Sequence, residues 1–163
     1  MIRLKFLALL LVTAGLLSHS CRDPKVIDSM EEARTMDVDG LYTIDIPPNM
    51  EPTTGLNAEA SLQYRDIQRE AYTLVIHESK EKLLQLIGSD RDRPILEVYR
   101  EIRLQLLAGT TQIQDRAPIR EHSLNGLRAE SLEVDALVEG IDGEISYFLT
   151  FVEGPVNVFL IMS

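Results

Sequence analysis

The sequence predicts an α+β protein in which an antiparallel sheet of about six or seven strands packs against helices. Apolar and polar residues alternate over short segments before residue 79 and again after residue 111, the period of a strand with one buried face. Between them, apolar residues recur every three or four positions, as in an amphipathic helix. The pair Asn125-Gly126 favours a two-residue hairpin and so indicates antiparallel neighbours.

The chain has the size and composition of one globular domain, with an acidic balance. It has 163 residues, of which 45% are hydrophobic and 26% charged, and its formal net charge is −10. Nucleic-acid binding needs clustered Lys and Arg to neutralise phosphates, so we expect no nucleic-acid partner. The single cysteine, Cys21, excludes an intramolecular disulfide, and packing alone must hold the fold.

Residues 1–20 have the pattern of a signal peptide. Arg3 and Lys5 supply a positive start, and residues 6–17 form an apolar run of the length expected in such a leader. That run is too short for a membrane-spanning helix, which needs about 20 apolar residues. The small residues Ser18 and Ser20 precede Cys21 at the positions that a signal peptidase prefers. We therefore expect export and cleavage.

Residues 17–21, Leu-Ser-His-Ser-Cys, resemble the bacterial lipobox, in which the cysteine is acylated and becomes the new N-terminus. The segment departs from the usual lipobox by placing Leu17 at −4 and His19 at −2, as in looser lipoboxes of some Bacteroidota. The resemblance implies that acyl chains such as palmitate on Cys21 anchor the protein in a membrane without a spanning helix. The alternative is a plain secreted protein.

These segments predict the organisation of the whole chain. We expect a signal peptide over residues 1–20, a lipidated N-terminus and tether over residues 21–39, and one α+β domain over residues 40–163. The predicted location is the bacterial cell envelope, on the inner or the outer membrane, with the domain in the periplasm or at the surface.

The first half of the domain contains three predicted strands. Residues 41–46 are rich in β-formers and end at Pro47-Pro48, because proline cannot donate to a strand ladder. Residues 60–65 and 71–78 alternate apolar and polar side chains, and they are close enough in sequence to pair as a hairpin.

Two helices are predicted next. A short one over residues 79–87 ends at Gly88, and a longer one begins near Pro94 and ends with Gly109 at the position after its last turn. Its expected buried stripe is Ile95, Val98, Tyr99, Ile102 and Leu106, and its expected solvent face is Glu97, Arg100, Glu101 and Gln105.

The rest of the sequence predicts consecutive strands over residues 112–123, interrupted at Pro118, and over residues 127–138, 145–152 and 156–162. In the second of these, a β-bulge near Ser131 and Leu132 is expected, because it would bring all four charged residues to the wet face (Arg128, Glu130, Glu133 and Asp135). The strand over residues 145–152 is expected to be buried on both sides. The strand over residues 156–162 is either a protected edge or the end of a truncated chain.

The residues at 42–48, Tyr-x-Ile-x-Ile-Pro-Pro, followed by a hairpin, a helical insertion and a meander with Asn-Gly-Leu, resemble the PsbP-like superfamily. Residues 56–64 are more narrowly similar to small lipoproteins of Bacteroidota. The resemblance implies an antiparallel sheet between helices and transfers no function. It also implies a helix after the last strand, so either this fold lacks that helix or the natural chain continues.

The sequence offers little catalytic chemistry. His77 and His122 could meet at a metal with Glu78 or Glu121, but no ligand spacing supports a metal site, and we expect none. A nucleophile elbow and a glycine-rich phosphate loop are both missing from the sequence. We therefore expect neither enzymatic activity nor a cofactor.

Two charged motifs have simple alternatives. Residues 37–40, Asp-Val-Asp-Gly, begin like a calcium loop, but a solvated turn is the better interpretation because a strand follows. Four arginines could receive an anionic partner, although pairing with Asp92, Glu97 and Glu101 explains them more simply (Arg91, Arg93, Arg100 and Arg103).

Two functions remain as hypotheses. The first is a non-enzymatic, membrane-anchored envelope protein whose sheet or helical insertion engages another protein. The second is a periplasm-facing carrier of a small ligand, with a pocket between helix and sheet lined by Tyr64, Tyr99 and Tyr147. A hydrolase on a different fold is the weakest alternative.

Overall fold

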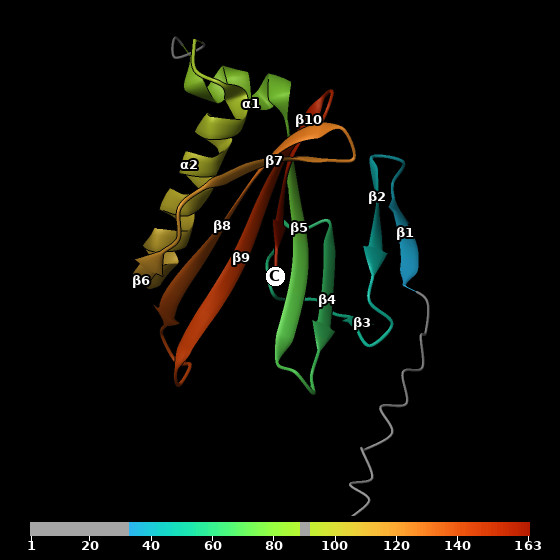
Figure 1. Ribbon diagram of the computed structural model, residues 1–163, viewed down its shortest axis with the longest axis vertical. Helices are drawn as coiled ribbons and strands as arrows, with labels where there is room; N and C mark the ends of the chain where they lie inside the picture. Colours follow the sequence, from blue (N-terminus) through green and yellow to red (C-terminus); the bar gives the residue numbers. More distant parts are fainter. Residues whose placement is uncertain (1–32, 89–91) are drawn as a thin grey trace, which may run out of the picture. The chain divides into compact units, whose positions relative to one another are not determined.

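The computed structural model describes residues 33–88 and 92–163, which contain ten strands and two helices (Figure 1). The predicted signal peptide, Cys21, most of the predicted tether and Arg91 lie outside these residues. Neither helix in the described part is long and apolar enough to cross a membrane.

The main sheet has eight strands in the order β3-β4-β5-β10-β9-β8-β6, and β7 also pairs with β8. All its pairings are antiparallel, which confirms the predicted α+β class. The strands are β3 (Glu51–Pro52), β4 (Leu62–Asp66), β5 (Ala71–Ser79), β6 (Thr111–Arg116), β7 (Arg120–Leu124), β8 (Leu127–Val138), β9 (Glu144–Glu153) and β10 (Asn157–Met162). The sheet exceeds the predicted count because β3 was missed and the strand interrupted at Pro118 forms two.

The helices are α1 (Lys80–Ile87) and α2 (Ile95–Thr110). Ser79 caps α1, since its hydroxyl accepts the Lys82 N–H at 3.1 Å. The prediction that Gly109 follows the last turn of α2 is wrong. The helix continues through Thr110, and the Thr111 N–H donates to the Leu107 carbonyl, so Thr111 ends the helix in extended geometry.

The buried stripe of α2 also differs from the predicted one. Leu96 and Leu104 are buried, whereas Leu106 is 55% exposed. Arg100, expected in solvent, is only 9% exposed. The run of apolar residues near the C-terminal end of the helix is compatible with two stripes, and packing against the sheet selects the one that contains Leu104.

The main core lies between the helices and one face of the sheet. Tyr99 and Phe151 meet there edge to face, with their ring centroids 6.1 Å apart. The other buried side chains of this cluster are Leu74, Ile76, Leu83, Leu96, Leu104, Leu132, Val134, Leu149, Val158 and Leu160.

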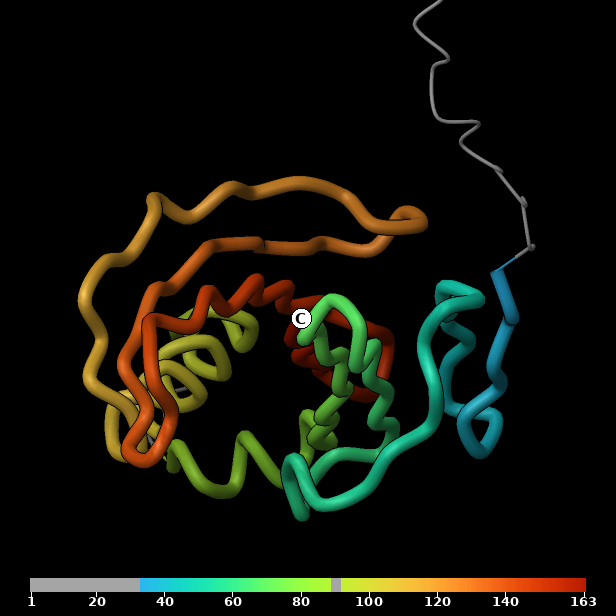
Figure 2. The backbone as a smooth tube through the Cα atoms, turned by 90° about the horizontal axis from the view of Figure 1, so that it is seen from below, coloured from blue at the N-terminus to red at the C-terminus, as the bar shows by residue number. Residues whose placement is uncertain are grey.

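A separate hairpin covers part of the opposite face. Strands β1 (Arg34–Val38) and β2 (Tyr42–Ile46) form their own two-stranded sheet and pack on β4, β5 and β10. Figure 2 shows this hairpin and the helices on opposite sides of β5. Residues 34–38 were expected in the tether and are instead a strand. The turn between β1 and β2 is the predicted solvated turn, in which Asp37 Oδ1 accepts the Gly40 N–H at 2.9 Å.

The predicted bulge in β8 is wrong. The register between β8 and β9 runs without a shift from Arg128 to Leu137, and the bulge lies instead in β6, between Ile113 and Asp115. Glu130 therefore faces the core, at 1% exposure, instead of reaching solvent.

The burial predicted for the last two strands, β9 and β10, also differs from the observed burial. β10 lies between β5 and β9, so it is an interior strand and not an edge. β9 is buried on both sides only near its C-terminal end, and Phe148 is 55% exposed.

Candidate functional site

His77 and His122 lie far apart. The register places His77, Phe159, Val152, Ala129 and His122 in one row across five strands, so four strand spacings of roughly 19 Å in total separate the two rings. The structure therefore does not bring them to a common metal. His77 Nδ1 lies 3.3 Å from the Ser61 hydroxyl, and His122 Nε2 lies 2.8 Å from the Ser131 hydroxyl.

The arginines of the helical insertion are engaged within the protein. Arg93 donates to Glu97 at 3.0 Å and to Glu101 at 2.7 Å, as predicted. Arg103 pairs with Glu59, and this hydrogen bond lowers the pKa of the Glu59 carboxyl. Arg103 also lies 5.2 Å from the centre of the Tyr99 ring.

Arg100 pairs with a residue that the sequence did not indicate. It donates to Glu130 in the core, and Arg128 donates to the other oxygen of the same carboxylate at 3.0 Å. The alternation pattern of one strand could not reveal this pairing, because Glu130 acquires its partner from the helix. The ion pair fixes the position of α2 on the sheet and leaves these arginines engaged within the fold.

The three tyrosines predicted to line a ligand pocket do not converge. Tyr99 and Tyr147 belong to the core beneath the helices, and Tyr64 belongs to the core beneath the β1–β2 hairpin, on the other face of the sheet. The Tyr99 hydroxyl donates to the Ile76 carbonyl at 3.4 Å, and burial raises the pKa of its phenol. This tyrosine is a packed core residue.

One part of the sheet is left uncovered by the described residues. It lies on the side away from the helices, over β6, β8 and β9, beyond the hairpin. We call this surface the open face, and it consists of Gln112, Asp115, Glu133, Asp135, Leu137, Glu144, Ser146 and Phe148. Phe148 is 55% exposed and Leu137 is 40% exposed. Both positions follow from the register of β8 and β9.

The charges of the open face are of one sign. Asp115, Glu133, Asp135 and Glu144 form no ion pair with another described residue, although Asp135 accepts the Ser146 hydroxyl at 2.6 Å. Around the helices, by contrast, arginines and lysines neutralise the acids in pairs. Part of the excess negative charge of the chain thus lies on the uncovered surface.

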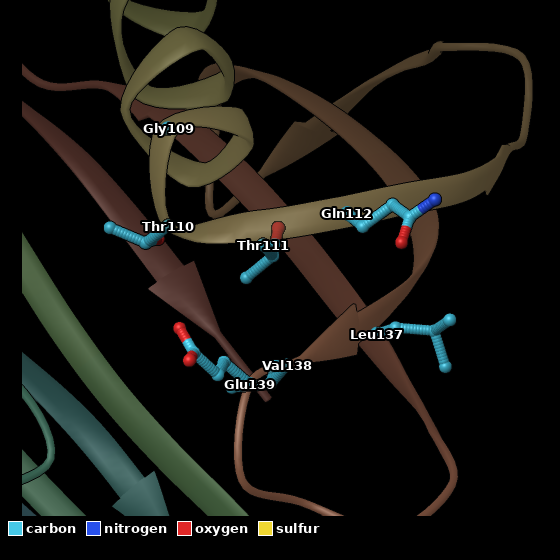
Figure 3. Close-up of a pocket in the computed structure, with 7 residues that line it drawn as sticks. All are labelled: Gly109, Thr110, Thr111, Gln112, Leu137, Val138 and Glu139. Atoms are coloured by element: carbon cyan, nitrogen blue, oxygen red, sulfur yellow. The ribbon is translucent and has the colours of Figure 1, made fainter.

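A hollow of about 390 Å³ adjoins one end of the open face (Figure 3). It is lined by Gly109, Thr110, Thr111, Gln112, Leu137, Val138 and Glu139. In Figure 3, the side chains of Gln112 and Leu137 point to one side, away from Glu139.

A second hollow, of about 580 Å³, shares Gly109 and Thr110 with the first and reaches the exposed Leu106. All residues that line this second hollow belong to α2.

The open face suits binding more than chemistry. Its side chains are carboxylates, amides, hydroxyls and two apolar groups, and within the described residues no three metal-ligating side chains gather at one point. Exposed aromatic and aliphatic side chains with polar neighbours are typical of the apolar centre and polar rim of protein interfaces. This surface could not be predicted from the sequence, because the open face depends on which segments the hairpin and helices cover.

Comparisons with known proteins assign neither a family nor a function to this chain. No family model matches the chain, and no curated protein does. The solution structure of cyanobacterial PsbP (CyanoP) from Synechocystis sp. PCC 6803 is similar, with a TM-score of 0.48 and 14% sequence identity, over 82% of this chain and 81% of that chain. This similarity brings no family, function or site to this chain.

Proposed function

We propose that this chain is a lipid-anchored, non-enzymatic protein of the bacterial cell envelope that binds another protein through the open face. The observation that carries the proposal is the exposure of Phe148 and Leu137 on a sheet surface that the described residues leave uncovered. Scattered exposed apolar residues are normal, but here Phe148 and Leu137 lie on the same face of the paired strands β8 and β9, and a hollow adjoins Leu137.

The anchor in this proposal is Cys21. It rests on the leader, on the lipobox-like residues 17–21 and on the lack of another cysteine in the sequence. An anchored domain needs no further membrane contact, so its exposed surfaces are available to a partner in the envelope.

Photo-cross-linking in cells tests the binding role. A photoreactive phenylalanine analogue replaces Phe148 in one variant and Tyr72 in a control variant. Tyr72 is also an exposed aromatic residue, at 47%, but it lies on the helix side of the sheet. We expect a discrete protein adduct from position 148 and none from position 72.

The same adduct should be lost when Leu137→Ser is added, because that change removes a second anchor of the same surface. Equal adducts from both positions, or none from position 148, would contradict the proposed function. A carrier of a small ligand would instead yield a bound small molecule and no reproducible protein adduct.

A further inference from the structure

We infer that the partner of the open face is a cationic protein segment, in which Lys or Arg side chains flank an apolar residue. This inference rests on the proposed function and adds the chemistry of the partner. Its basis is the arrangement of charge and apolar surface on β6, β8 and β9, given by the strand register.

Two carboxylates of like charge face each other across two strands of the open face. Asp115 in β6 lies directly opposite Asp135 in β8, and both side chains belong to the open face. Like charges directly opposite each other destabilise a sheet. No basic described residue forms an ion pair with either carboxylate. The fold carries an unfavourable pair that a cationic ligand would relieve.

The two exposed apolar side chains of the open face lie on either side of that pair. Phe148 lies opposite Glu133, and Leu137 lies opposite Glu144. The row of Ser146 and Asp135 runs between these two rows. Each exposed apolar side chain thus has a carboxylate as its cross-strand neighbour, so a ligand that packs on either one also meets a negative charge.

The open face has the size of a short protein segment. The rows of Phe148 and Leu137 are four residues apart along β9 and β8, roughly 13 Å, and β6 to β9 span about two strand spacings, roughly 10 Å. About four residues of extended chain, or somewhat more than two turns of helix, would cover the length of this area. An extended segment in which basic and apolar residues two positions apart share one face therefore fits both its dimensions and its charge, whereas nucleic acid and anionic lipid would be repelled.

The test uses the full-length chain, purified as the cell makes it, and three labelled peptides of about a dozen residues. One peptide, called the Lys–Leu peptide, repeats Lys-Ser-Leu-Ser, so that Lys and Leu share one face of the extended chain. The second repeats Glu-Ser-Leu-Ser, and the third repeats Lys-Ser-Ser-Ser. Binding is followed by fluorescence anisotropy. We expect the Lys–Leu peptide to bind at least about tenfold more tightly than either of the others, and its affinity to fall as ionic strength rises from about 0.05 M to about 0.5 M.

A charge-matched pair of variants locates the binding. The test variant is Asp115→Asn, Glu133→Gln and Asp135→Asn. The control variant is Glu51→Gln, Glu81→Gln and Glu121→Gln, which removes three exposed carboxylates outside the open face and so leaves the same net charge. We expect the test variant to lose about tenfold in affinity for the Lys–Leu peptide, together with most of the salt dependence, and the control to stay within about twofold of the parent.

Equal losses in the two variants would show attraction to net charge alone and overturn the inference, as would no loss in the test variant. The proposed function can fail separately. If position 148 gives a protein adduct in cells while the test variant binds the peptide like the parent, the inference is wrong and the proposed function stands. If the peptide results hold without an adduct, the proposed function is wrong. Thermal unfolding shows that the test variant is folded, and its melting temperature should not fall, because charge repulsion is relieved.

Discussion

Glu130 is a charged side chain in an apolar setting, at 1% exposure beside Leu132 and Val134 of the same face of β8. It is tolerated there because Arg100 and Arg128 both donate to its carboxylate. Burying a charge is costly unless it is paired and hydrogen-bonded, and removing one partner is more harmful than removing both. The pair thus ties α2 to β8 at one point.

Arg100→Met should lower the free energy of unfolding by about 3 kcal/mol, because it leaves the Glu130 carboxylate buried with only the half-exposed Arg128 as its partner. The double variant Arg100→Met, Glu130→Leu should recover most of that loss, since no buried charge remains. Urea unfolding of the parent and both variants measures this. A double variant as unstable as the single one would show that the ion pair itself supplies the stability.

Asp66 ends β4 and organises the turn to β5. The Asn49 side chain donates to its carboxylate at 2.5 Å, and the N–H groups of Gln68 and Arg69 donate as well. The hydrogen bond from Asn49 is the main cause that lowers the pKa of Asp66, and burial opposes it. A lowered pKa in the folded state means stability that is present above the ordinary pKa of aspartate and is lost as the pH falls through the lowered value.

Asn49→Ala should raise the pKa of Asp66 towards the ordinary value, so that Asp66 contributes less stability at neutral pH and less stability is lost as the pH falls. An NMR titration of the Asp66 carboxyl carbon in the parent and the variant provides the measurement. An unchanged pKa would mean that the backbone donors alone stabilise the ionised carboxylate.

At the scale of elements, the alternation of residues predicted β4, β5, β8, β9 and β10 within a few residues of their observed bounds. Strand β1 was missed because its sequence is mostly polar and charged, and only Met36 and Val38 contribute to the core beneath the hairpin. The faces of α2 and β8 were misassigned for a related reason. A period fixes how often a side chain returns to one face, but neighbouring elements decide which face is buried.

The β1–β2 hairpin depends on its packing, because it forms no strand ladder with the main sheet. Ile46 is 1% exposed in its core, and the Tyr42 hydroxyl lies 2.8 Å from that of Ser61. Ile46→Ala should cost about 2 to 5 kcal/mol of unfolding free energy and should speed amide hydrogen exchange in β1 and β2 more than in β9.

Ile141→Ala is the control for the hairpin variant, since Ile141 is 52% exposed and its loss should cost less than about 0.5 kcal/mol. Urea unfolding together with hydrogen exchange followed by mass spectrometry compares the two. Equal acceleration of exchange in the hairpin and in β9 would show that the hairpin unfolds only with the whole domain.

At the scale of the whole molecule, the two faces of the main sheet differ in which described residues cover them and in their charge. Helices cover one face, the hairpin covers part of the other, and acidic side chains occupy the rest. The fold class could be predicted from periodicity and turn residues. The open face could not, because it requires the strand register and the position of the hairpin. Cys21, in contrast, was predicted from local sequence alone and lies outside the described residues.

Labelling with a fatty-acid analogue tests the anchor independently of the open face. The wild-type chain should take up the label and sediment with membranes, while Cys21→Ser should take up none and be found in the soluble fraction. A wild type as unlabelled as Cys21→Ser would end the lipoprotein hypothesis and favour a plain secreted protein.

The central claim is that the open face is covered by a partner in the cell. Hydroxyl-radical footprinting of Phe148 and Tyr72, in intact cells and on the purified chain, tests it most directly, because both rings are about half exposed and lie on opposite sides of the sheet. We predict that Phe148 is oxidised several times more slowly in cells than in the purified chain, relative to Tyr72. Equal protection of the two residues, or no protection of Phe148, would contradict the claim.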